Sequence, residues 1–271
     1  MNKRLASGIL ALLLAALVAA PALAQTAPDS AAAKKFADAQ VTIEQLRKQK
    51  DTDWKAILAQ YEICAPVVAY TDKAFGTGYD KEIREKIALC AEGKDVRANQ
   101  QYLAKGLQDV NVINMRSLLR QTAKDKNAPA VIAAFFEGVR PTFIRRDKDF
   151  YKGTPTLEKE ALDALAGISA GGPAAMTAIR NFEDAVDRTY GLSVLYEVEE
   201  MEEIQATKPE ECPVKVAEAS VFYRIVKPRI AKKSPKDDAF IIQMLAGSCA
   251  AMNAAELEKA LNAGLAPAKL R

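Results

Sequence analysis

Hydrophobic residues recur along most of this chain with the spacing of amphipathic helices. Between positions 54 and 68 the apolar residues fall at i, i+3, i+4, i+7, i+11 and i+14, along one stripe of a helix: Trp54, Ile57, Leu58, Tyr61, Ala65 and Val68. Further stripes run from Ile83 to Cys90 and from Val96 to Val110. The alternation of period two that is typical of half-buried strands does not occur in the sequence. The pattern predicts an all-α fold, with three helices in residues 51–128.

The same three-stripe pattern returns twice further along the chain. In every copy an aromatic residue is followed five positions later by a proline: Tyr61 and Pro66, Phe136 and Pro141, Tyr223 and Pro228. The second stripe of each copy ends in a similar short tail, and these tails are 79 and 80 positions apart, at Cys90, Ser169 and Cys249. Repetition at a fixed period is the sequence signature of stacked modules. We therefore predict a helical array or bundle of three related modules of about 80 residues within one compact domain: 51–128, 129–207 and 208–271.

The amino-terminal residues have the features of a secretory signal peptide. Lys3 and Arg4 supply positive charge, residues 9–20 are apolar, and the small residues at 22–24 form a cleavage site before Gln25. This predicts a signal peptide over residues 1–24, cleaved after Ala24, and a mature protein located in the periplasm or secreted. The apolar segment is shorter than the roughly 20 residues that span a bilayer, so no integral membrane segment is expected. Residues 25–50 are expected to form a loose leader followed by a polar helix.

Net charge and histidine content bear on which partners and which catalytic mechanisms can be expected. The formal net charge is +3, and removal of Lys3 and Arg4 with the signal peptide leaves +1, which gives no electrostatic reason to expect nucleic acid as a partner. The absence of histidine excludes Ser-His-Asp and Cys-His mechanisms and histidine-ligated metals. A G-x-S-x-G match at residues 167–171 lacks the histidine of a nucleophile elbow, and its Ser169 takes the repeat position of a cysteine expected to face the core. We expect no catalytic residues, no metal and no cofactor.

The four cysteines predict two disulfides in an exported chain. Cys64 and Cys90 lie about equally far on either side of the turn near position 77, so an antiparallel helix pair brings them level. Cys212 and Cys249 are nearly symmetric about the turn at residues 232–234. The expected pairs are therefore Cys64 with Cys90 and Cys212 with Cys249. A redox-active pair is the less favoured alternative, because no C-x-x-C spacing occurs.

Three groups of residues are candidates for binding. The aromatic residues of the proline-containing stripes either line an apolar ligand pocket or fill the core: Tyr61, Phe136, Phe143, Phe222 and Tyr223. A basic patch near residues 232–234 is compatible with an anionic ligand or with ordinary solvated surface: Lys227, Arg229, Lys232, Lys233 and Lys236. An acidic run that begins at Glu197 and continues to Glu211 is expected to be a solvated helix face.

Taken together, these features favour binding over catalysis. Stacked helical modules produce extended surfaces for partners. We expect an exported, non-enzymatic binding or scaffold protein that presents a helical surface or groove to a protein partner. The alternative is a periplasmic carrier that holds a hydrophobic small molecule or lipid between its helices.

Overall fold

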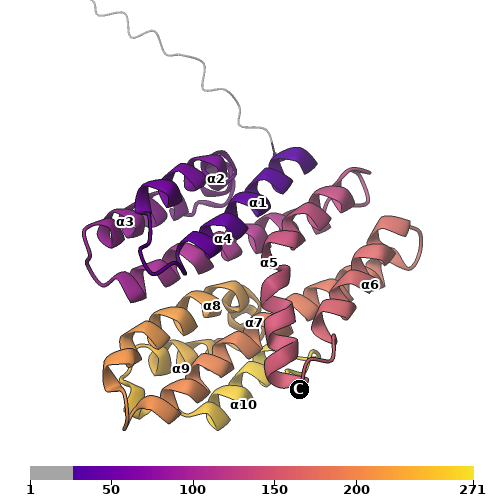
Figure 1. The fold of residues 1–271 in the computed structure, drawn as a ribbon. Coiled ribbons are helices and arrows are strands. Elements are labelled where there is room, and N and C mark those ends of the chain that lie inside the picture. The colour runs from indigo at the N-terminus through magenta and orange to yellow at the C-terminus, as the bar shows by residue number, and fades with distance from the viewer. Residues whose placement is uncertain (1–26) are drawn as a thin grey trace, which may run out of the picture.

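The structure, a computed structural model, describes residues 27–271 and is helical throughout that range (Figure 1). Its ten α-helices and two short 3-10 helices follow one another in this order: α1 (Ser30–Leu46), α2 (Trp54–Phe75), α3 (Tyr79–Ala91), α4 (Val96–Leu119), α5 (Ala128–Phe150), α6 (Leu157–Ala170), α7 (Ala175–Ile204), η1 (Pro209–Glu211), α8 (Cys212–Lys233), α9 (Pro235–Leu245), η2 (Cys249–Ala251) and α10 (Ala254–Leu265). The predicted all-α fold is confirmed. Each of these helices is too short or too polar to cross a membrane. The predicted signal peptide lies outside the described residues.

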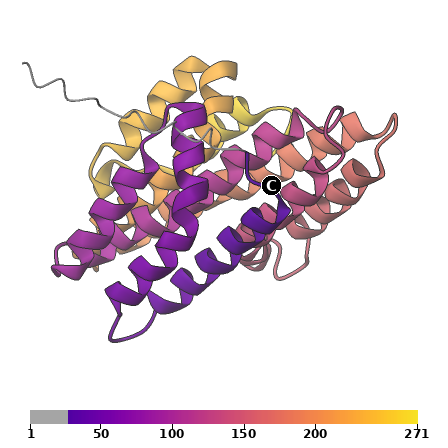
Figure 2. The same ribbon diagram turned by 90° about the horizontal axis from the view of Figure 1, so that it is seen from above.

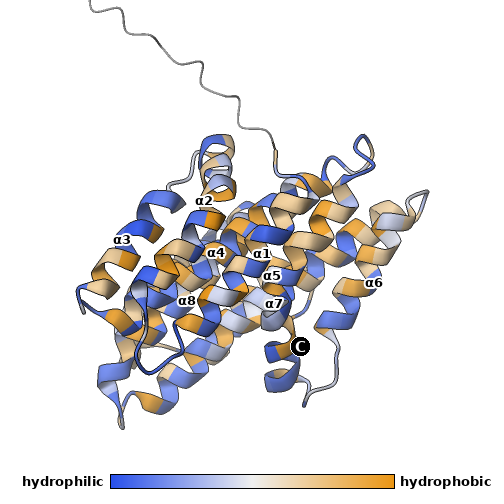
Figure 3. Ribbon diagram, turned by 45° about the horizontal axis from the view of Figure 1, so that its top comes forward, coloured by the Kyte–Doolittle hydropathy of each residue, from blue (hydrophilic) through white to orange (hydrophobic). Residues whose placement is uncertain are grey.

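The helices pack around one continuous apolar core. Buried residues from all ten α-helices contribute to it. Helix α8 packs against both α4 and α7, and α1 packs against α2 and α5. In Figure 1 the indigo and purple helices α1–α4 lie on one side of the molecule and the orange and yellow helices α8–α10 on the other, and Figure 2 shows the same arrangement from above. Most helices carry both orange and blue segments in Figure 3, as expected where one face is buried and the other is solvated.

The three repeated prolines lie inside helices and not at their ends. Pro66, Pro141 and Pro228 are interior residues of α2, α5 and α8. Six positions after the first two prolines, an aspartate caps the next helix. The Asp72 carboxylate accepts the backbone N–H groups of Tyr79 and Asp80 at 2.8 and 2.9 Å, at the start of α3. A carboxylate at this position satisfies N–H groups that have no partner within the helix.

Asp147 has the same role for the next pair of helices. Its carboxylate accepts the backbone N–H groups of Leu157 and Glu158 at 2.8 and 3.1 Å, at the start of α6. Long helices α2 and α5 thus each fix the start of the short helix that follows them. Helix α6 packs against α7, and the two helices line a groove.

One of the two predicted disulfides is present and the other is not. Cys212, at the start of α8, is bonded to Cys249 in η2, with Cα atoms 5.9 Å apart. Cys64 and Cys90 are both buried free thiols, so the prediction that they pair is wrong. The Cys64 thiol contacts the carbonyl oxygen of Phe36 in α1, whereas the Cys90 thiol contacts the carbonyl oxygen of Val96. The two thiols therefore contact different neighbours.

Candidate functional site

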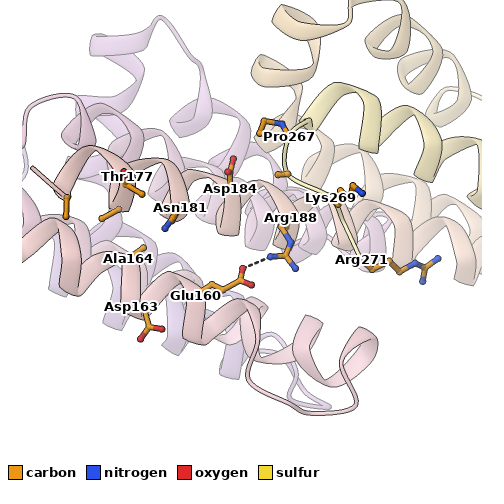
Figure 4. Close-up of a pocket in the computed structure, with 13 residues that line it drawn as sticks. Glu160, Asp163, Ala164, Thr177, Asn181, Asp184, Arg188, Pro267, Lys269 and Arg271 are labelled. Carbon is orange, nitrogen blue, oxygen red and sulfur yellow. Dashed lines mark hydrogen bonds and ion pairs between the residues drawn. The ribbon is translucent and has the colours of Figure 1, made fainter.

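A groove of about 720 Å³ lies between α6, α7 and the carboxy-terminal segment 267–271 (Figure 4). Small and apolar residues supply much of its lining: Ala164, Ala174, Ala178, Pro267 and Ala268. Polar side chains are added by Thr177 and Asn181, on successive turns of α7. The groove therefore combines contact area for apolar groups with hydrogen-bonding groups of both kinds.

Close approach of its walls gives the groove its shape. A Cβ atom added at Gly167 would lie 2.9 Å from the Cβ of Ala178, so glycine permits α6 and α7 to pack closely at this point. On the other wall, Leu270 is fully buried, and its backbone N–H donates to the Asn262 side chain at 2.9 Å. The Tyr151 hydroxyl donates to the carbonyl oxygen of Leu270, also at 2.9 Å. These contacts hold the carboxy-terminal segment in place as a wall.

Most charged groups in the groove are committed to ion pairs. Arg188 pairs with Glu160, as Figure 4 shows, and also donates to the Tyr151 hydroxyl at 2.8 Å. Burial by itself would lower the pKa of Arg188, but the pairing with Glu160 outweighs it, and the pKa is raised above its ordinary value. Arg271 pairs with Glu258 at 2.8 Å. Paired charges of this kind orient side chains and leave little free charge for chemistry.

A second cavity of about 450 Å³ adjoins the groove and shares Asp184 and Pro267 with it. At its base, the almost fully buried carboxylate of Asp187 accepts hydrogen bonds from Arg116 of α4 and Arg229 of α8. Arg229 also pairs with Asp184 at 2.7 Å. One buried carboxylate on α7 thus ties α4 and α8 together. We call this second cavity the basic cleft, and its full lining is Arg116, Arg120, Arg180, Glu183, Asp184, Asp187, Pro228, Arg229, Lys232 and Pro267.

A third set of charged groups is buried between the helices, away from both cavities. Lys105 of α4 pairs with Glu218 of α8 at 3.1 Å and lies over the Phe222 ring at 4.8 Å. Lys215 of α8 pairs with Glu197 of α7 at 3.0 Å. Burial, reinforced by the nearby negative charge of Glu218, raises the pKa of Glu197 to about 7. The expectation that Glu197 belongs to a solvated face is therefore wrong, because Glu197 lies at the seam between two packed helices.

The five aromatic residues of the predicted apolar pocket are buried in the core. Phe136 packs edge-to-face on Phe143 with ring centroids 5.1 Å apart, and Phe222 lies 6.0 Å from the Tyr190 ring. The two tyrosines direct their hydroxyl groups outward from the core, and each donates to an aspartate at 2.7 Å: Tyr61 to Asp80 and Tyr223 to Asp238. Neither the groove nor the basic cleft is lined by any of the five.

Other sequence candidates also have defined positions. Ser169 of the G-x-S-x-G match is exposed in the last turn of α6, so it does not face the core as expected, and a helix takes the place of the strand that a nucleophile elbow requires. Within residues 27–271, no three His, Cys, Asp or Glu side chains are grouped as metal ligands. The basic patch contributes Arg229 and Lys232 to the basic cleft. The other cations of the cleft were missed, because no local pattern connects them.

The chain matches no protein-family model, no curated protein sequence and no solved structure.

Proposed function

We propose that this protein is an exported, non-enzymatic binding protein whose groove between α6, α7 and residues 267–271 holds a segment of a partner protein. The observation that carries this proposal is the groove itself. Its volume of about 720 Å³ is within the range of roughly 300–1,000 Å³ that is usual for ligand sites. Its alanine-rich lining offers contact area, and Thr177 and Asn181 offer hydrogen bonds to a peptide backbone. Its charged side chains are mostly engaged with one another.

The carrier alternative draws less support from the packing. A carrier needs a cavity lined by apolar groups, and the aromatic residues that were candidates for it pack against one another within the core. The groove is bordered by charged residues, including Asp163, Arg188 and Lys269. Its chemistry suits a peptide better than a lipid chain.

Site-specific photocrosslinking tests the proposal. A photoreactive amino acid at Thr177 or Asn181, both exposed in the groove, is expected to capture one and the same protein from the periplasm. The matched control places it at the exposed Lys81 on α3, which lies on the far side of the molecule from α6 in Figure 1 and should not capture that protein. The captured protein is then purified and its affinity measured by calorimetry.

A large side chain placed in the groove tests whether the groove is the docking site. Asn181→Trp should abolish binding of the purified partner, whereas Lys81→Trp should leave it unchanged. Equal affinity in both variants would refute the groove as the docking site. A stoichiometric lipid found by mass spectrometry in an extract of the purified protein would favour the carrier instead.

We also propose that residues 51–128, 129–207 and 208–271 are three copies of one ancestral helical module. Support comes from the interior prolines of α2, α5 and α8, from the capping carboxylates Asp72 and Asp147, and from the matched tyrosine–aspartate bonds of the first and third segments. Superposition of the three segments is the test. A shared helix order with different packing angles would contradict it.

The proposed location is the periplasm or the extracellular space, after cleavage of residues 1–24. The disulfide between Cys212 and Cys249 is consistent with an oxidising compartment. Amino-terminal sequencing of the protein recovered from the periplasm is expected to begin at Gln25. A chain that retains Met1 and remains in the cytoplasm would refute this location.

A further inference from the structure

The basic cleft beside the groove carries more positive charge than its own carboxylates neutralise. Five cations line it, together with three carboxylates. Asp184 and Asp187 are already engaged by Arg229 and Arg116. Three cations remain, Arg120, Arg180 and Lys232, and among residues 27–271 none of them is in an ion pair. The single carboxylate left to oppose them is Glu183, so the cleft has a surplus of two positive charges.

The three cations come from different helices. Arg120 directly follows α4, Arg180 is in the second turn of α7, and Lys232 is near the end of α8. Their convergence depends on the packing of these three helices, which the buried hydrogen bonds of Asp187 to Arg116 and Arg229 hold together. The cleft is therefore built on a rigid base, and the charged groups at its rim are the ones left free for a ligand.

The side chains of the cleft also have hydrogen-bond donors to spare. Arg120 uses its Nε–H on the carbonyl oxygen of Arg116 at 3.1 Å, which leaves both of its Nη groups free. Arg180 makes one long contact, at 3.3 Å, to the Thr177 hydroxyl. Guanidinium groups match the geometry of phosphate and carboxylate oxygens, and lysine adds a compact charge. A ligand with two negative charges and several acceptor oxygens fits both the charge surplus and the donors.

We propose that the basic cleft is a binding site for a phosphate group in its dianionic form. Its volume of about 450 Å³ accommodates a phosphate that carries an organic substituent. The site stands independently of the segment proposed to occupy the groove, although Asp184 and Pro267 border both cavities. The two sources of such a group, free inorganic phosphate and a phosphate monoester, are distinguished by experiment.

Calorimetric titration of the mature protein at low ionic strength, with inorganic phosphate and with glycerol 3-phosphate as probes, tests the site. Saturable binding of either probe is expected. Tighter binding of glycerol 3-phosphate assigns the site to an ester, and equal or weaker binding assigns it to the free anion; both results support a phosphate site. Because the second ionisation of a phosphate ester has a pKa of about 6, affinity for glycerol 3-phosphate should fall as the pH is lowered through that value.

Charge variants then locate the binding. Arg120→Gln, Arg180→Gln and Lys232→Gln together should weaken binding by about tenfold or more, since a single charged hydrogen bond contributes that much. The control removes three exposed cations from α2 and α3, with Lys55→Gln, Lys73→Gln and Lys81→Gln. It should retain the affinity. Glu183→Gln removes the opposing carboxylate and should raise affinity about twofold.

The proposal is overturned by any of three results. These are no saturable binding of either probe, equal weakening in the cleft variant and the control, or weaker binding in Glu183→Gln. The Glu183→Gln variant is informative because loss of folding cannot imitate the gain in affinity that the proposal expects. Circular dichroism of each variant shows whether its helical structure is intact.

Discussion

The α2–α3 and α8–α9 helix pairs make the same hydrogen bond but are stabilised in different ways. In both, a tyrosine of the long helix donates to an aspartate near the start of the short one at 2.7 Å. The first pair is followed by the 24-residue helix α4, and its long helix α2 packs against α1. The second is followed by the 12-residue α10, and there the disulfide joins the start of α8 to η2. Covalent linkage thus occurs in the pair that is followed by the shorter helix.

The region that includes α2–α4 meets the region that includes α8–α10 where α4 packs on α8. The largest expected effect on stability is for a substitution at this contact. Lys105→Met leaves Glu218 buried beside an apolar side chain. The loss of a single partner from a buried ion pair costs roughly 3–5 kcal/mol. Urea unfolding at pH 7 should show this decrease in the free energy of unfolding. The matched control is the exposed pair of Lys159 and Asp163, where Lys159→Met should change stability by less than about 1 kcal/mol.

Removal of the disulfide is expected to have the second-largest effect on stability. Cys212→Ser with Cys249→Ser opens a loop whose ends are 37 positions apart, and the chain-entropy account gives a loss of roughly 3–4 kcal/mol. Reductant should lower the stability of the wild-type protein to a similar extent and leave the variant unchanged. An additional effect of reductant on the variant would mean that Cys64 and Cys90 are bonded after all.

A count of reactive thiols tests whether Cys64 and Cys90 are free while Cys212 and Cys249 are bonded. Burial raises the pKa of Cys64 to about 12 and that of Cys90 to about 11, so neither thiol should react with a thiol reagent in the folded protein at pH 8. After unfolding in urea without reductant, two thiols should react. A count of zero would contradict the assignment of one disulfide.

The outcome for the cysteines shows what could be predicted from the sequence. The period of the apolar residues depends on local geometry, so Ile57, Tyr61 and Val68 could be assigned to one buried helix face before the fold was known. Counting positions from a turn fixes height along a helix pair, but not the direction in which a side chain points around the axis. Cys64 and Cys90 are therefore separate buried thiols with different neighbours.

The candidate sites were beyond prediction for a related reason. Arg120, Arg180 and Lys232 are 60 and 52 positions apart in the chain and line one cleft only because α4, α7 and α8 pack together. The groove depends in the same way on the return of residues 267–271 to α7. Glu197 is also buried by helix packing, which the sequence does not show. Its acidic neighbours in the chain favoured a solvated helix face instead.

Two raised carboxyl pKa values, those of Glu197 on α7 and Asp109 on α4, predict a dependence of stability on pH. Burial raises the pKa of Glu197 to about 7 and that of Asp109 to about 6, above ordinary values of 4.5 and 3.8. Between the ordinary and the raised value, the folded protein binds more protons than the unfolded chain, so stability falls as the pH rises through that window. We expect a loss of up to about 3 kcal/mol for each group, because one pKa unit corresponds to about 1.4 kcal/mol.

Amide variants separate the pH ranges over which Glu197 and Asp109 affect stability. Glu197→Gln should flatten the unfolding free energy between pH 4.5 and 7, and Asp109→Asn should flatten it between pH 3.8 and 6. Urea unfolding across this pH range measures both. A steeper fall in stability with rising pH in either variant would show that the sign is wrong.

The smallest expected effect compares the matched tyrosines directly. Tyr61→Phe and Tyr223→Phe each remove one hydroxyl donor, at a cost of about 1 kcal/mol for a partly buried bond. Asp80 keeps a second partner after the loss, since the Arg84 side chain donates to it at 3.0 Å, whereas Asp238 is in no ion pair among the described residues. Tyr223→Phe should therefore destabilise the protein slightly more than Tyr61→Phe. In an Arg84→Met background, Tyr61→Phe should lower the free energy of unfolding by as much as Tyr223→Phe does. A double-mutant cycle of Tyr61 with Arg84 would measure their coupling. A larger cost for Tyr61→Phe would contradict this expectation, because the phenylalanine ring keeps the contact that the Tyr61 ring makes with the Arg84 guanidinium, 5.0 Å away.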